Sequence, residues 1–66
     1  MYTYKEQYEA FIGRKFYHKD DKDLLYTFGT INEDETVQVL NEDDEIPYGI
    51  EESLGFIRDN IWVVLD

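Results

Sequence analysis

The sequence has no cysteine, and only one proline, one histidine, one serine and one tryptophan among its 66 residues. Without cysteine, disulfides and thiolate metal sites are excluded, which fits a reducing compartment. No apolar run approaches the roughly 18 residues that a membrane-spanning helix needs. The N-terminal residues lack the basic segment and apolar run of a signal peptide. We therefore expect one acidic domain over residues 1–66, located in the cytoplasm.

Basic residues are also scarce, with six against sixteen acidic ones and a formal net charge of −10. Residues 1–32 balance five carboxylates with five basic side chains, whereas residues 33–66 carry eleven carboxylates and only Arg58. Phosphates and anionic lipids would be repelled, so nucleic acid and membrane surfaces are disfavoured as direct partners. The uneven distribution instead predicts a partner that is itself charged.

Two segments have the pattern of short amphipathic helices. Thr3 and Glu6 have the spacing of a capping box, and residues 3–12 carry an apolar stripe that we expect in the core. Gly13 is suited to end this helix in the left-handed conformation. The second helix is expected to begin after Gly49 and to end at Asn60. The stripe residues are Tyr4, Tyr8, Phe11 and Ile12 in the first helix, and Ile50, Leu54, Ile57 and Ile61 in the second.

Four segments have the composition of strands: residues 15–18, 24–31, 36–40 and 61–65. Within residues 24–31, alternation places Leu24, Tyr26 and Phe28 on one face and Leu25, Thr27 and Ile31 on the other, and Gly29 suggests a bulge or a close backbone approach. The apolar run 61–65 is typical of a strand that is buried on both faces. Residues 19–23, 32–35 and 41–45 are expected as loops, and Pro47 supports this prediction for the last of them. The predicted fold is α+β, a small antiparallel sheet with two short helices in the order α-β-β-β-α-β.

Catalysis is not expected. A Ser-His-Asp unit would require His18 and Ser53 to meet, and Ser53 is predicted in the middle of a helix rather than on a strained turn. The glycines have no phosphate-loop spacing, and neither acidic segment has the ligand spacing of an EF-hand. We therefore predict no catalytic residues, no dedicated metal site and no cofactor.

The carboxylates suggest imitation of a nucleic acid, because duplex DNA carries about one charge per 1.7 Å of axis. Residues 33–35 and 42–45 flank a five-residue strand that is about 17 Å long. The turn with Asp20, Asp21 and Asp23 should lie at the end of residues 42–45, and the second helix should begin shortly beyond that cluster. The predicted partner-binding acids are Glu33, Asp34, Glu35, Glu42, Asp43, Asp44, Glu45, Glu51 and Glu52. Acidic loops that only promote solubility are the simpler alternative.

Phe56 lies off the apolar stripe of the second helix. It is either a contact anchor for a protein partner or a dimer, or part of a helix that is buried over a wide arc. Tyr2, Tyr17 and Tyr48 are further candidates for exposed contacts. The alternative to mimicry is therefore a regulatory or interaction domain that binds through an aromatic patch around Phe56. Dimerisation would let so short a chain enlarge its core or its acidic face.

The C-terminal segment, from Tyr48-Gly49-Ile50-Glu51-Glu52 through Trp62-Val63-Val64-Leu65, resembles the tails of many small bacteriophage proteins of unknown function. Gly49 stands where serine or threonine is the commoner helix cap. In size and acidity the chain also resembles phage-encoded DNA mimics, which inhibit uracil-DNA glycosylase, nucleoid proteins or defence nucleases. This resemblance implies a non-catalytic inhibitor that acts on a basic, DNA-binding host protein in the host cytoplasm. It assigns no role to individual residues.

Overall fold

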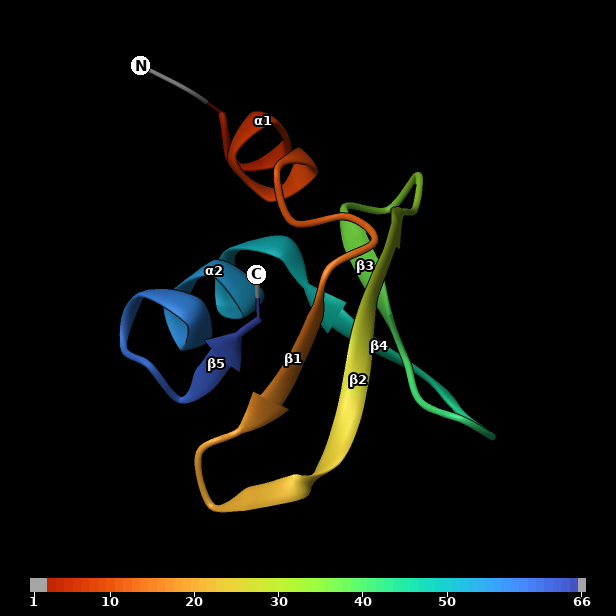
Figure 1. Ribbon diagram of the computed structural model, residues 1–66. Helices are drawn as coiled ribbons and strands as arrows, with labels where there is room; N and C mark the ends of the chain where they lie inside the picture. The colour runs from red at the N-terminus through yellow and green to blue at the C-terminus, as the bar shows by residue number, and fades with distance from the viewer. Residues whose placement is uncertain (1–2, 66) are drawn as a thin grey trace.

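A five-stranded antiparallel sheet with two helices packed on one face makes up the structure, a computed structural model that describes residues 3–65 (Figure 1). The expected α+β class is confirmed. In chain order the elements are α1 (Tyr4–Glu9), β1 (Lys15–His18), β2 (Asp21–Ile31), β3 (Thr36–Leu40), β4 (Glu45–Gly49), α2 (Ile50–Arg58) and β5 (Trp62–Val64). Across the sheet the strand order is β4-β3-β2-β1-β5, so β2 is central and β4 and β5 are the edges.

Helix α1 begins with the predicted capping box, because Thr3 and Glu6 exchange side chain to backbone hydrogen bonds. It ends at Glu9, three residues before the expected boundary, and turns lead from there to Gly13 at φ 88°. Only Tyr8 of the predicted core stripe is fully buried, whereas Tyr4 and Ile12 are 51% and 39% exposed. A helix of six residues contacts the sheet over little more than one turn, so residues at its two ends project beyond the core.

Strand β2 contains a bulge at Gly29. Phe28 pairs with Val39 and Ile31 pairs with Val37, so β2 has one residue more than β3 in this interval. Ile31 therefore packs against the core on the same face as Phe28, and its predicted assignment to the opposite face was wrong. The close backbone approach predicted at Gly29 is confirmed, since a Cβ there would lie 2.5 Å from the carbonyl oxygen of Gln38.

Strand β4 was expected as loop because of its acids and Pro47. It pairs with β3 along its whole length, with Pro47 opposite Gln38. The hydrogen bonds from Ile50 N to the Glu35 carbonyl and from Asn41 N to the Asp44 carbonyl bracket this pairing. Because bonded pairs alternate along an antiparallel ladder, the nitrogen of Pro47 points away from β3, where no donor is needed. Proline is thus compatible with this edge strand. Residues 19–23 were likewise expected as loop, but residues 21–23 belong to β2.

Helix α2 begins after Gly49 as predicted, without a side-chain cap. Asn60 has the predicted left-handed conformation at φ 59°. The amides of Asn60 and Ile61 donate to the carbonyls of Ile57 and Phe56, which is the hydrogen-bond pattern of a Schellman motif. This motif turns the chain directly into β5.

Aromatic rings form most of the core. Phe16 stacks on Phe28 with ring centroids 4.2 Å apart, and Trp62 lies 4.6 Å from Phe16. Tyr8 from α1 and Phe56 from α2 cover this stack, so both helices lie on the same face of the sheet. Strand β5 was expected to be buried on both faces, but it is an edge strand that pairs only with β1, and the next residue, Leu65, is 37% exposed. The central strand is β2, whose Phe28 is in contact with most of these rings.

Candidate acidic interface

The nine predicted partner-binding acids are all exposed, and the fold places them at two ends of the sheet. We call Glu42, Asp43, Asp44 and Glu45 the turn-end acids, because they lie at the turn between β3 and β4. We call Glu33, Asp34, Glu35, Glu51 and Glu52 the hairpin-end acids, because they lie at the β2–β3 loop and the adjoining start of α2.

Glu51 and Glu52 lie at the opposite end of the sheet from the predicted position. The extra strand β4 carries the chain back along β3, so α2 begins beside residues 33–35 and not beyond residues 42–45. The hydrogen bond from Ile50 N to the Glu35 carbonyl fixes this junction. By contrast, Asp23 and Glu42 line the same hollow, as the antiparallel topology predicted for the turn end.

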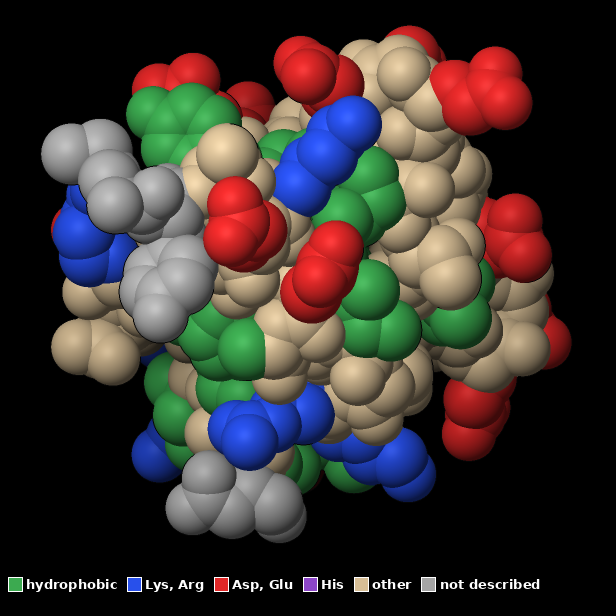
Figure 2. Space-filling model, turned by 90° about the horizontal axis from the view of Figure 1, so that it is seen from above, with side chains coloured by type: hydrophobic (Ala, Val, Ile, Leu, Met, Phe, Trp, Pro, Cys, Tyr) green, Lys and Arg blue, Asp and Glu red, His purple; other side chains and the backbone are tan. Residues whose placement is uncertain are grey.

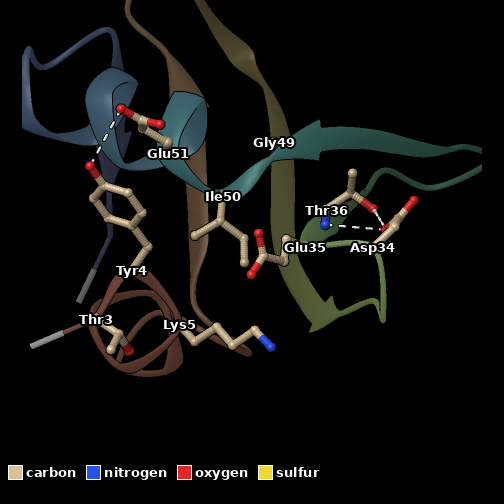
Figure 3. A pocket seen from close by; sticks show the side chains of 9 residues that line it. All are labelled: Thr3, Tyr4, Lys5, Asp34, Glu35, Thr36, Gly49, Ile50 and Glu51. Carbon is tan, nitrogen blue, oxygen red and sulfur yellow. Dashed lines mark hydrogen bonds between the residues drawn. The ribbon is translucent and has the colours of Figure 1, made fainter.

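Three of the hairpin-end acids, Asp34, Glu35 and Glu51, line an open hollow of about 600 Å³ between α1, the β2–β3 loop and the start of α2 (Figure 3). Lys5 is the one basic residue among those that line it, and it extends from α1 toward the same hollow as Glu35. The Tyr4 hydroxyl donates to Glu51 Oε1 at 3.4 Å. The hollow therefore combines three carboxylates with one lysine and one exposed aromatic ring.

The β2–β3 loop is held in one conformation by Asp34 and Asn32. Asp34 Oδ1 accepts hydrogen bonds from the Thr36 hydroxyl at 2.6 Å and from the Thr36 amide at 3.3 Å. The hydroxyl bond, followed by the amide bond, lowers the pKa of Asp34 below its usual value and so favours the charged form. Asn32 Nδ2 also donates to the Thr36 hydroxyl oxygen. Glu35 completes the turn at φ 64°, a conformation that residues other than glycine seldom adopt.

The turn-end acids are fixed mainly by backbone contacts. Asn41 N donates to the carbonyl of Asp44, and Asn41 Oδ1 accepts from the amide of Glu42. These bonds close a tight turn whose four acidic side chains are all exposed.

None of the nine acids forms an ion pair within residues 3–65. The ion pair in this part of the chain joins Arg58 to Asp59, and His18 Nδ1 lies 3.9 Å from Asp20 Oδ2. Figure 2 looks onto the end that carries α1 and shows carboxylates along the upper and right margins, whereas several basic side chains lie across the lower half of the view. The acidic charge is therefore not neutralised internally and is available to cations of a partner.

The residues that a catalytic triad would need have other roles. Ser53 is fully buried and its hydroxyl donates to the Gly49 carbonyl at 3.0 Å, inside the first turn of α2. His18 lies at the end of β1, where Nδ1 accepts from the Asp20 amide. Among residues 3–65, no three His, Asp or Glu side chains are grouped so as to hold a metal ion.

Phe56 is partly buried and packs against the core. Its ring lies 4.9 Å from Trp62 and 6.2 Å from Tyr48. The structure thus favours burial of α2 over a wide arc, the second of the two interpretations of this residue. Tyr17 and Tyr48 are partly buried, and Tyr2 lies outside the described residues.

The sequence prediction missed the apolar character of the sheet face opposite the helices. Leu25 is 45% exposed there, and Leu40 lies in the same hollow with Leu25 and Thr27. The alternation in residues 24–31 had already placed Leu25 on the face opposite Tyr26 and Phe28, and an exposed apolar residue on that face indicates contact with something outside the core.

Comparison with known protein families, with curated proteins and with solved structures found no match to this chain. Within the described residues, no helix is long and apolar enough to cross a membrane. The function must therefore be inferred from the surface itself.

Proposed function

We propose that this protein is a non-catalytic inhibitor that binds a basic, DNA-binding protein by presenting carboxylates in place of DNA phosphates. The observation that carries the proposal is the exposure of all nine acids, without internal ion pairs, at two ends of one sheet. A bacteriophage origin and action in the host cytoplasm belong to the same proposal, on the strength of the resemblance to phage-encoded mimics.

The charge density supports this function. Without Asp66, residues 3–65 carry a net charge of −9, and the longest dimension of the molecule is 33 Å. Division gives about 3.7 Å of length per net charge, which is about half the linear charge density of duplex DNA, with its one charge per roughly 1.7 Å, and similar to that of a single strand.

The fixed geometry of the loops is a second support. Asp34 and Asn41 accept hydrogen bonds and Asn32 donates one within the two acidic turns, which hold defined conformations, so little loop entropy is lost when a partner binds. Charges on exposed, pre-ordered loops accelerate association and make it sensitive to salt.

The experiment is capture of binding proteins from a bacterial lysate on the immobilised chain, followed by titration of the captured protein with each variant. The test variant is Asp43→Asn/Asp44→Asn, and the control is Glu9→Gln/Asp59→Asn, which removes the same charge from exposed positions outside the two acidic clusters. We expect the test variant to bind about 2- to 30-fold more weakly, because the free energies of two exposed charge pairs are lost together. The control should change the affinity less than about twofold.

Mimicry also predicts competition with duplex DNA and a large loss of affinity between about 50 and 200 mM salt. Binding that is indifferent to salt, or that persists unchanged in the Asp43/Asp44 variant, would contradict the proposal.

A further inference from the structure

The face of the sheet opposite the helices carries a band of apolar side chains. Because successive residues of a strand point to opposite faces, the neighbours of the core residues Phe16, Phe28 and Val39 point outward. The outward residues that form the band are Tyr17, Leu25, Thr27, Leu40, Val63 and Leu65.

The strand register brings this band together. Val63, Tyr17 and Leu25 are paired in one row across β5, β1 and β2. In the next row Thr27 lies between Lys15 of β1 and Leu40 of β3, so one lysine interrupts the apolar side chains. Leu25 and Leu65 are 45% and 37% exposed, and no helix covers them. Apolar side chains on three adjoining strands thus form a single outer surface, in contrast to isolated exposed leucines that need no explanation.

One end of the band is hollowed and bordered by acids. Leu25, Thr27 and Leu40 line an open hollow of about 550 Å³. Its other lining residues include one lysine, Lys15, and two acids, Asp23 and Glu42, so its charged side chains are net acidic. The remaining turn-end acids adjoin Leu40 on the other side. An occupant of this hollow must therefore combine apolar side chains, which face the sheet, with basic side chains at the turn end.

The side-chain oxygen of Gln38, on the same face, lacks a hydrogen-bond donor among the described residues. This residue lines a second hollow, next to Thr27 and Leu40, and its Oε1 is screened from solvent. An unpaired amide oxygen is costly, and a donor from a bound partner would satisfy it after rotation of the side chain.

We propose that the outer sheet face is the docking surface for an amphipathic basic segment of the partner. The leucine-lined hollow takes the apolar side chains of that segment, and Asp23 and the turn-end acids pair with its lysine or arginine residues. A second copy of this chain is a poorer occupant, because it would bring ten further negative charges against the same acidic rim. This inference rests on the proposed function and specifies which part of the acidic surface the partner contacts.

The test uses two synthetic peptides of about 14 residues, or four helical turns, with identical lysine content. One has leucine at i, i+3, i+4 and i+7, and the other has glutamine at these positions. The proteins are the wild-type chain, Leu25→Gln at the hollow, and Ala10→Gln as a control at an exposed apolar residue outside the sheet face and outside both acidic clusters. Thermal melts first establish that both variants are folded.

We expect the leucine peptide to bind the wild-type chain about tenfold or more tightly than the glutamine peptide, the factor for burial of one leucine side chain. Leu25→Gln should remove most of this difference, and Ala10→Gln should leave it unchanged. Equal binding of the two peptides, or loss of the difference in Ala10→Gln instead, would overturn the docking surface. Binding of the glutamine peptide depends on the acids alone. If this peptide binds and the binding weakens with salt, but leucine adds nothing, then the docking surface is wrong and the proposed acidic interface stands. If neither peptide binds, the proposed function fails as well. A Leu25-dependent dimer in sedimentation would assign the face to a second copy and also overturn the inference.

Discussion

Glu35 is the position where stability and proposed function can be separated most cleanly. Its φ of 64° is left-handed, and its side chain is exposed in the β2–β3 loop. Its backbone carbonyl accepts from Ile50 N, and its amide donates to Asn32. Glycine at this position keeps both backbone bonds and relieves the steric conflict of the Cβ. We therefore predict that Glu35→Gly stabilises the fold.

The size of the gain follows from two opposing effects. A non-glycine residue in the left-handed region costs about 1–2 kcal/mol. Glycine in turn lowers the free energy of unfolding by about 0.5–1 kcal/mol, because it gives the unfolded chain greater conformational entropy. The net gain in the free energy of unfolding is about 0.5–1 kcal/mol, which raises the melting temperature of a domain this small by about 2–8 °C.

The assay is thermal unfolding followed by circular dichroism, with Glu35→Gln as the matched control. The control removes the same charge, and with it any repulsion among the hairpin-end acids, but keeps the Cβ and its conflict. Both variants should lose the same modest affinity for the partner, up to about fivefold. If Glu35→Gly melts no higher than Glu35→Gln, the left-handed conformation of Glu35 is not a source of strain and the reasoning fails.

Two further predictions concern the core. The Tyr8 hydroxyl donates to the Gly29 carbonyl at 2.8 Å, and burial raises the pKa of Tyr8 to about 12. Because the folded protein holds this proton more tightly than the unfolded chain does, the resulting stability is fully present below pH 10 and should be lost as the pH rises toward 12. Tyr8→Phe should flatten that alkaline loss, measured as melting temperature against pH, and should cost about 1–3 kcal/mol at neutral pH by leaving a carbonyl unpaired. Gly29→Ala should lower the free energy of unfolding in urea by at least about 2 kcal/mol, because the new methyl group would collide with the Gln38 carbonyl. The helical control Gly55→Ala, with only a flexible Arg58 atom 3.7 Å away, should gain about 0.5–1 kcal/mol; equal effects of the two changes would contradict the close approach at Gly29.

The sequence predicted those features whose signals are local. The capping box of Thr3 and Glu6 was identified correctly, because it depends on residues three positions apart. The same holds for the start of α2 after Gly49 and for the left-handed residue Asn60. Strand β4 was missed, because acids and a proline argue for loop unless the strand is known to lie at an edge, and edge position is a property of the whole sheet.

That single strand changed the proposed interface. By itself, the sequence determined which residues are acidic, that all of the net charge lies after residue 32, and that the acids must stay in water. The tertiary structure alone decided their arrangement: β4 moves Glu51 and Glu52 to the hairpin end, and leaves the turn-end acids beside the apolar sheet face. The physical reason is that charge belongs to individual side chains, whereas the neighbours of a charge depend on the register and direction of strands that are distant in sequence.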